Sequence, residues 1–218
     1  MIVDIHAHLV PKQYLAEEHL KVMSEFSIDK SVVVAAAWGL LSFDDFSKAN
    51  DFILTDSSSF LRVLIPFAVI NPLHGEMALE EMDRRVAEGF KGFKLLPHKH
   101  GAYTVDSPLV DPLIEKAVEL DVPVFVHTDF NNNYCTPYQL VQLARRHPKA
   151  KLIMGHMGID PEMIRFVPHL VKEAKNLYLD ISCTPDMPEL VIAKPVQVLG
   201  SHRILFGTDL PELHPVTL

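Results

Sequence analysis

The sequence predicts an α/β fold: a (β/α)₈ TIM barrel in a single domain, residues 1–218, that lacks most of the eighth helix. Two observations predict it. Short apolar runs of strand length alternate with helical segments along the whole chain, which is typical of a parallel sheet covered by helices. No glycine-rich dinucleotide loop follows the first strand, where His-Ala-His-Leu-Val-Pro stands instead. A doubly wound open sheet is the alternative fold.

The individual elements follow from apolar periodicity and from the residues that end each run. Strands are expected at residues 2–8, 30–38, 61–70, 90–96, 122–128, 151–155, 177–182 and 203–207. Helices are expected at residues 11–26, 43–59, 75–88, 108–120, 137–147, 161–174 and 189–199. Gly89 suits the C-terminal end of the third helix, and Pro195 is expected to kink the last one.

The chain after the eighth predicted strand is too short for a complete eighth helix. We therefore expect the flank between the first and last strands to be apolar and incompletely covered. Either the chain is shortened, or contact with a second copy covers that flank, so a homo-oligomer is one expected partner.

Composition limits the classes of function. Hydrophobic residues make up 48% and charged residues 22% of the chain, and the net charge is −8. An acidic protein is a poor ligand for nucleic acid or an anionic membrane, which both require a basic face. The two cysteines do not form a disulfide scaffold, and we find no signal peptide or membrane-spanning run. The expectation is a cytoplasmic protein that binds a small molecule.

The first strand carries the polar residues around which the chain is organised. Because side chains alternate between the faces of a strand, Asp4, His6 and His8 are expected to share one face. Two imidazoles that are two residues apart can reach one metal ion, and histidine nitrogens suit zinc and related divalent metals. The HxH pair alone is weak evidence, and its weight depends on further ligands.

Those ligands stand at the ends of later strands. The fifth strand ends at His127, the sixth is followed by His156, and the eighth is followed by Asp209. In a barrel of parallel strands the active site lies at the carboxyl ends of the strands. Closure of the barrel would therefore bring these side chains together with His6 and His8.

With these motifs the sequence resembles the amidohydrolase superfamily, and within it the amidohydrolase-2 group of metal-dependent hydrolases and decarboxylases. The matching segments are Asp4-x-His6-x-His8, Gly89-Phe90-Lys91-Gly92-Phe93-Lys94-Leu95-x-Pro97, His127, Gly155-His156-x-Gly158 and Phe206-Gly207-Thr208-Asp209-x-Pro211. The resemblance extends over almost the whole chain. The missing C-terminal segment is the departure from the pattern.

The resemblance implies the roles of the metal-binding residues. His6, His8, His127 and Asp209 would bind the metal, and Asp209 would also accept a proton from the metal-bound water. A site of three imidazoles and a carboxylate with one open position fits a catalytic zinc ion, so one zinc is expected. His156 would act as a catalytic acid or base, or polarise the substrate.

The other candidate residues would contact the substrate. Lys94 is expected to point into the barrel, where it could hold a substrate carboxylate. It could instead be carboxylated and bridge two metal ions, with His127 and His156 on the second ion. Trp38, Asn71 and His98 follow strands and are expected to line the pocket.

Hydrolysis is the expected reaction, with metal-bound hydroxide attacking an amide, ester or lactone. One alternative is the non-oxidative decarboxylation of an aromatic or unsaturated carboxylate, which the same group also performs. Another is a metal-binding protein without turnover.

Overall fold

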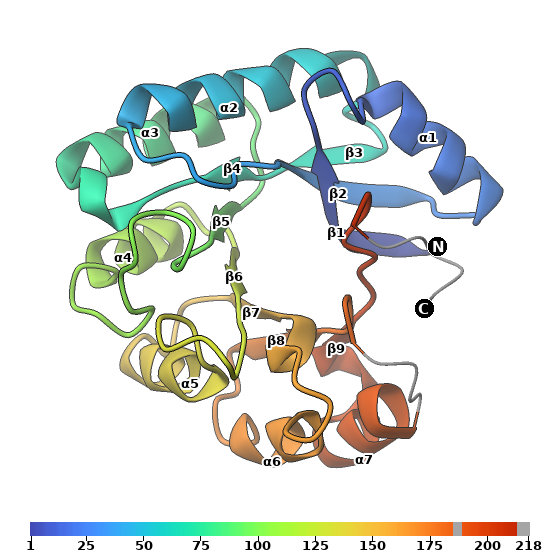
Figure 1. Ribbon diagram of the computed structural model, residues 1–218, viewed down its shortest axis with the longest axis vertical. Coiled ribbons are helices and arrows are strands. Elements are labelled where there is room, and N and C mark those ends of the chain that lie inside the picture. The colour runs from blue at the N-terminus through green and yellow to red at the C-terminus, as the bar shows by residue number, and fades with distance from the viewer. Residues whose placement is uncertain (185–188, 213–218) are drawn as a thin grey trace.

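A ring of parallel strands surrounded by helices forms the fold in the computed structural model, in which residues 1–184 and 189–212 are described (Figure 1). The strands are β1 (Val3–Leu9), β2 (Lys30–Ala35), β3 (Leu64–Pro66), β4 (Ala68–Val69), β5 (Phe93–Leu95), β6 (Val124–His127), β7 (Leu152–Gly155), β8 (Leu177–Asp180) and β9 (Ile204–Leu205). The helices are α1 (Ala16–Glu25), α2 (Phe43–Ser57), α3 (Glu76–Ala87), α4 (Asp111–Glu119), α5 (Pro137–Arg146), α6 (Val167–Leu170) and α7 (Lys194–Leu199). The predicted barrel is confirmed.

The barrel closes through backbone hydrogen bonds at two interruptions. The third predicted strand is divided into β3 and β4 at Phe67, whose N–H still donates to Val33 O at 2.9 Å. At the other junction, β1 pairs with the chain that follows β9: Asp209 N donates to His6 O at 2.7 Å. This second junction places Asp209 beside the HxH pair although about 200 residues separate them.

Three predicted helices differ from those observed. The helix predicted at 161–174 contains only a 3₁₀ turn (Ile164–Phe166) and the short α6, because Pro168 has no N–H and is tolerated only near a helix start. The first helix starts at Ala16 rather than residue 11. The last comprises a π-helical turn (Glu189–Ala193) before α7, where Pro195 lies near the start of α7 and not at a central kink.

The chain after β9 forms no helix within the described residues, which end there at 212. This agrees with the prediction that most of the eighth helix is lacking. In the described part of the chain, no helix is both long and apolar enough to cross a membrane.

Apolar side chains pack on both sides of the strands. The larger cluster lies between the strands and the surrounding helices and includes Leu9, Phe93 and Leu179. A smaller cluster includes Val32, Phe67 and Phe125. Such packing holds the strands rigidly, and the residues at their carboxyl ends are thereby placed with little freedom.

Candidate metal centre

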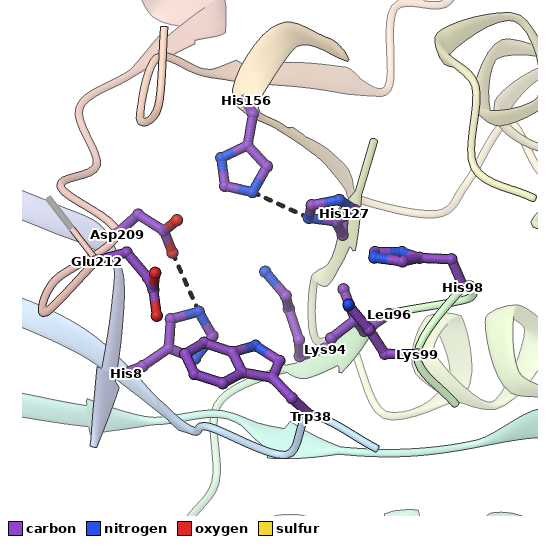
Figure 2. Close-up of a pocket in the computed structure, with 10 residues that line it drawn as sticks. All are labelled: His8, Trp38, Lys94, Leu96, His98, Lys99, His127, His156, Asp209 and Glu212. Carbon is purple, nitrogen blue, oxygen red and sulfur yellow. Dashed lines mark hydrogen bonds and ion pairs between the residues drawn. The ribbon is translucent and has the colours of Figure 1, made fainter. Parts of the chain in front are cut away.

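A pocket of about 360 Å³ opens among residues at and beyond the carboxyl ends of the strands (Figure 2). This volume lies at the small end of the range for ligand sites in proteins. The lining residues are His8, Trp38, Lys94, Leu96, His98, Lys99, His127, His156, Asp209 and Glu212. Most of the predicted site residues therefore meet in one place.

His6 converges with His8 and Asp209, and the latter two residues line this pocket. The Nε2 atoms of His6 and His8 lie 3.2 Å apart, and each lies 3.1 Å from Oδ1 of Asp209. All three residues are buried. Potential ligand atoms from two imidazoles and one carboxylate thus face one another within 4.8 Å.

This arrangement fits a bound divalent cation. The Nδ1 atom of His6 lies 3.1 Å from Oδ2 of Asp180, so its proton is best placed on Nδ1. The Nε2 atom of His6 then offers a lone pair toward His8 and Asp209. Lone pairs brought together in a buried site repel one another unless a cation lies between them, and nitrogen and oxygen ligands suit a divalent metal.

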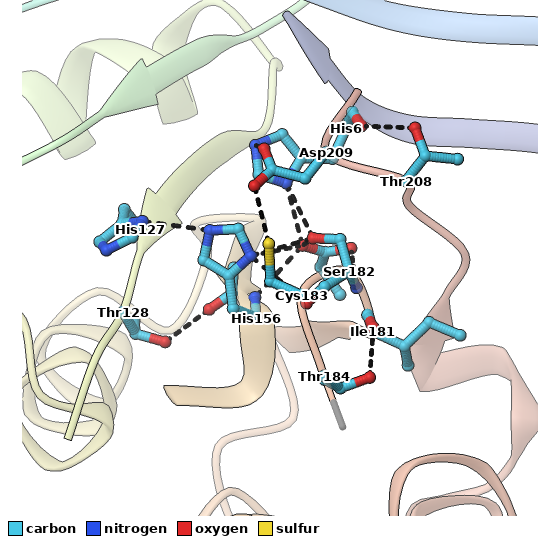
Figure 3. Close-up of polar contacts among 12 residues, drawn as sticks. His6, His127, Thr128, His156, Ile181, Ser182, Cys183, Thr184, Thr208 and Asp209 are labelled. Carbon is cyan, nitrogen blue, oxygen red and sulfur yellow. Dashed lines mark hydrogen bonds and ion pairs between the residues drawn. The ribbon is translucent and has the colours of Figure 1, made fainter. Parts of the chain in front are cut away.

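Ser182 lies against His6 and His156 (Figure 3). The sequence analysis missed Asp180, two residues earlier in the chain. Its carboxylate is fully buried, accepts from His156 N at 3.2 Å and faces His6 Nδ1. The Ser182 hydroxyl donates to the same carboxylate. Burial raises the pKa of Asp180. The signal was available, because Asp180 ends an apolar strand as the predicted ligands do.

His127 and His156 form a second pair on the side of β6 and β7. Nδ1 of His127 lies 3.1 Å from Nε2 of His156, and both residues line the pocket. Potential ligand atoms of His6, His8 and Asp209 all lie within 4.8 Å of one another. His127 is within the same distance of a different pair, His98 and Cys135. The predicted set of four ligands is therefore found as a tight group of three, with His127 nearby.

Lys94 extends into the pocket as predicted, and it is 3% exposed. Its Nζ lies 2.9 Å from Nε2 of His6 and 3.8 Å from the centre of the Phe125 ring. Burial lowers the pKa of Lys94 to about 8, although Asp209 and Asp180 act in the opposite direction. A cationic group thus already approaches the acceptor atoms of the candidate metal centre.

The surroundings of Asp209 keep it ionised, and those of His156 keep it unprotonated. Burial by itself would raise the pKa of Asp209, but His6 and His8 hold it well below its ordinary value. Burial, reinforced by His6, lowers the pKa of His156 to about 4. At neutral pH the site therefore presents a carboxylate and an unprotonated imidazole.

The backbone at the site is strained. His156, Cys183 and Asp209 have φ angles of 63°, 54° and 60°, in the left-handed region that residues other than glycine rarely adopt. Strain of this kind persists only where the surrounding structure enforces it, and it often accompanies function. Gly207 adds a close approach: a Cβ there would lie 3.0 Å from His6 Cβ and would clash with Asp180.

Asn71 does not line the pocket. It is buried, its amide donates to His100 O at 2.9 Å, and its carbonyl oxygen accepts from Leu73 N at 3.1 Å. The prediction of a substrate contact is not supported, because these bonds to two backbone segments occupy the side chain.

Asp4 is a second departure from the predicted arrangement. It accepts from Thr208 N at 3.0 Å and Thr208 Oγ1 at 2.7 Å, and so joins β1 to the chain after β9. The β1–β2 register shifts between Asp4 and Ala7, which interrupts the expected alternation along β1. Glu212, which lines the pocket, carried no strand-end signal and was missed.

Comparison with known proteins identifies the family. The family model described as amidohydrolase matches residues 3–215, so the chain belongs to the amidohydrolase family that the strand-end motifs resemble. None of the curated proteins compared with the sequence matches it significantly.

Several solved structures share the fold. 2,6-Dihydroxybenzoate decarboxylase from Rhizobium has a TM-score of 0.77 and 19% identity, over 98% of this chain and 89% of that one. 5-Carboxyvanillate decarboxylase from Novosphingobium aromaticivorans, complexed with manganese and a nitrobenzoic acid, has a TM-score of 0.78 and 17% identity, over 98% and 87%. 4-Oxalomesaconate hydratase from Rhodopseudomonas palustris has a TM-score of 0.73 and 22% identity, over 97% and 82%. At these identities the likeness establishes the fold alone.

Proposed function

We propose that the protein is a metal-dependent, non-oxidative decarboxylase of a small, planar, aromatic or unsaturated carboxylate. The observation that carries this proposal is the position of Lys94, a buried ammonium group that lies against a metal-ligating histidine inside a small pocket. A buried lysine is costly unless an anion pairs with it, and a substrate carboxylate would supply that anion.

The shape and chemistry of the pocket favour a flat substrate. Trp38, His98 and His127 contribute rings to the lining, and Lys99 adds a second cationic group. Flat rings bury the faces of an aromatic or conjugated molecule well. Two lysines near a bound divalent ion together favour an anionic ligand over a neutral one.

The metal would be held by His6, His8 and Asp209, with His127 as a further ligand. A bound divalent ion polarises substrate oxygens and lowers the pKa of a water molecule. Asp180 accepts from Nδ1 of His6 and fixes that ring so that Nε2 faces the metal position. Relatives in fold have been solved with manganese, and the nitrogen and oxygen donors here also suit zinc, so both metals are candidates.

The remaining residues would position the substrate and transfer a proton. Lys94 pairs with the carboxylate, and Trp38 and His98 orient the ring. When carbon dioxide leaves, the bond between the carboxylate carbon and the substrate breaks, and a proton from the site bonds to the remaining carbon. Asp209 and His156 line the pocket and are unprotonated at neutral pH, so we assign them to relaying that proton from a water molecule, which is left as hydroxide.

Hydrolysis is the second candidate, and the neutral His156 favours it, because an unprotonated imidazole can accept a proton from an attacking water molecule. We rank it below decarboxylation because the structural relatives include decarboxylases that act on hydroxylated aromatic carboxylates.

Isotopically labelled water distinguishes the two reactions. The purified protein, loaded with manganese or zinc, is incubated with hydroxybenzoates and with small lactones and amides. Decarboxylation releases carbon dioxide and puts solvent deuterium on carbon, whereas hydrolysis puts solvent ¹⁸O into a new acid. Incorporation of ¹⁸O without carbon dioxide release would refute the decarboxylase proposal.

Metal analysis of Lys94→Ala tests whether Lys94 pairs with substrate or bridges two ions. If it pairs with the substrate carboxylate, turnover falls and metal content is unchanged. If the variant loses an ion that the unmodified protein carries, Lys94 is a carboxylated bridge and the mononuclear site is wrong.

A further inference from the structure

A second cluster of potential metal ligands lies beside the candidate centre. Ligand atoms of His98, His127 and Cys135 all lie within 4.8 Å of one another. His98 comes from the loop after β5, His127 ends β6, and Cys135 precedes α5. Figure 2 shows the rings of His98 and His127 next to each other, and their centroids are 4.8 Å apart. Three separate segments therefore bring two imidazoles and a thiol together.

The distances are close to those of a tetrahedral zinc site. Sγ of Cys135 lies 3.8 Å from Nδ1 of His98. With ordinary Zn–S and Zn–N bond lengths, a sulfur and a nitrogen on one tetrahedral zinc ion are about 3.5 Å apart. If Sγ of Cys135 and Nδ1 of His98 moved a few tenths of an ångström closer, their separation would match that on a zinc ion. His98 is in a loop, so its side chain can make this movement.

The surroundings of Cys135 favour a cation over a reactive thiol. Burial raises the pKa of Cys135 to about 12, so the thiol would become a ligand only when a bound metal displaces its proton. The Asp129 carboxylate interacts electrostatically with both Cys135 and His98. The hydroxyl of Tyr103, also electrostatically coupled to Cys135, is buried without a hydrogen-bond partner in the described part of the chain. The Asp129 carboxylate thus adds negative charge near the cluster, which favours a cation there, and the Tyr103 hydroxyl is an unused donor.

We propose that His98, His127 and Cys135 form a second metal site, selective for a thiophilic divalent cation such as Zn²⁺ or Cd²⁺. Thiolate ligands select soft or borderline metals over manganese, so Mn²⁺ would leave this site empty. We assign His127 to the first metal and His98 to the substrate, so occupation of the second site would withdraw one ligand from each. Excess zinc would therefore inhibit the protein, and excess manganese would not.

Cobalt titration tests the site without any substrate, so the result does not depend on the proposed reaction. The purified, reduced chain is titrated with Co²⁺ in the absence of oxygen. Bound metal is counted, and the thiolate-to-cobalt charge-transfer absorption is recorded. We expect the band to appear as binding rises from about one to about two equivalents per chain.

Two variants remove ligands of the second site only. Cys135→Ala should abolish the charge-transfer band and lower the affinity for the second equivalent of Co²⁺ by at least about tenfold. Binding of the first equivalent should be retained. His98→Ala, at a partly exposed position that is less critical for folding, should lower the affinity for the second equivalent to a similar extent. A second equivalent that binds equally well in both variants would refute the proposal.

Two further variants test which cysteine gives rise to the charge-transfer band. Cys183→Ala should keep it, because Cys183 instead donates to Oδ2 of Asp209 at 2.9 Å. His8→Ala should lose the first equivalent and keep the band. Absence of the band from the unmodified protein, or its loss in Cys183→Ala rather than in Cys135→Ala, would overturn the assignment.

Discussion

Two buried polar groups in this molecule are built on opposite electrostatic rules. Between α2 and α3, Arg85 lies 2.6 Å from Glu81 and 2.7 Å from Asp51, and Glu81 also accepts from Asn50 at 3.0 Å. Each buried charge there faces an opposite charge or a donor. At the carboxyl ends of the strands, three potential metal-ligand atoms of His6, His8 and Asp209 instead lie within 3.2 Å of one another, with Lys94 beside them.

The comparison shows that burial of polar groups does not by itself indicate function. The Glu81–Arg85 network is complete within the chain, as expected of a structural contact. The strand-end cluster offers atoms of three residues that one bound cation could contact at once. The convergence of several potential metal-ligand atoms on one point therefore separates a candidate binding site from a stabilising network. Mutations in the two groups should have different consequences.

Asp209→Asn should have the largest effect, on metal binding. This change removes the only carboxylate among the three grouped ligands. The affinity of the protein for the metal should fall by roughly a thousandfold or more. The metal-free protein should also lose some stability, because the lowered pKa of Asp209 means that its neighbours stabilise the carboxylate in the fold. Elemental analysis and urea unfolding of the metal-free chain measure the two quantities. Full metal occupancy in the variant would disprove the site.

Glu81→Ala should show the reverse pattern. Breaking a buried ion pair leaves Arg85 uncompensated on one side, and we expect the free energy of unfolding to fall by about 3 kcal/mol. Metal content should not change. Glu80→Ala, one residue earlier on the exposed side of α3, is the matched control and should have little effect. Equal losses in the two variants would contradict the structural role of the network.

Acid should destabilise the fold through buried neutral histidines outside the site. His19 bonds Ser31 Oγ at 2.8 Å, and burial lowers its pKa from 6.5 to about 4. The unfolded chain then binds a proton that the fold does not, so stability should fall by roughly 2 to 3 kcal/mol as the pH decreases from 6.5 to 4. His19→Gln should reduce this slope in unfolding experiments across that range. His100, whose pKa is also lowered to about 4, should leave a residual slope.

Asp180→Asn should have the smallest effect of the four. The amide oxygen of the new side chain can still accept from Nδ1 of His6. The negative charge that makes the His6 imidazole a stronger metal ligand is lost. Loss of such a partner behind a metal ligand typically costs 10- to 100-fold in metal affinity or activity. Ser182→Ala, which removes a hydroxyl and no charge, should cost less. Equal effects of the two changes would show that the charge of Asp180 does not matter.

Much of the site could be predicted because it rests on local patterns. His8, His127 and Asp209 each stand near the end of an apolar strand or beyond it, and His6 precedes His8 by two residues. Parallel strands present these ends at one edge. The same rule identifies Asp180 once the end of β8 is examined. Helix bounds were predicted less well where proline intervened, as at Pro168, because a short helix carries little periodicity.

The sequence by itself determined the barrel, the family and the strand ends that would carry metal ligands, because the period of side chains along a strand is a local property. Only the tertiary structure decided where the loops go. It turned Asn71 toward backbone partners, directed Asp4 to Thr208, and placed Cys135 beside His98. Loop positions depend on packing between distant segments, and no pattern within a short window of residues records that packing.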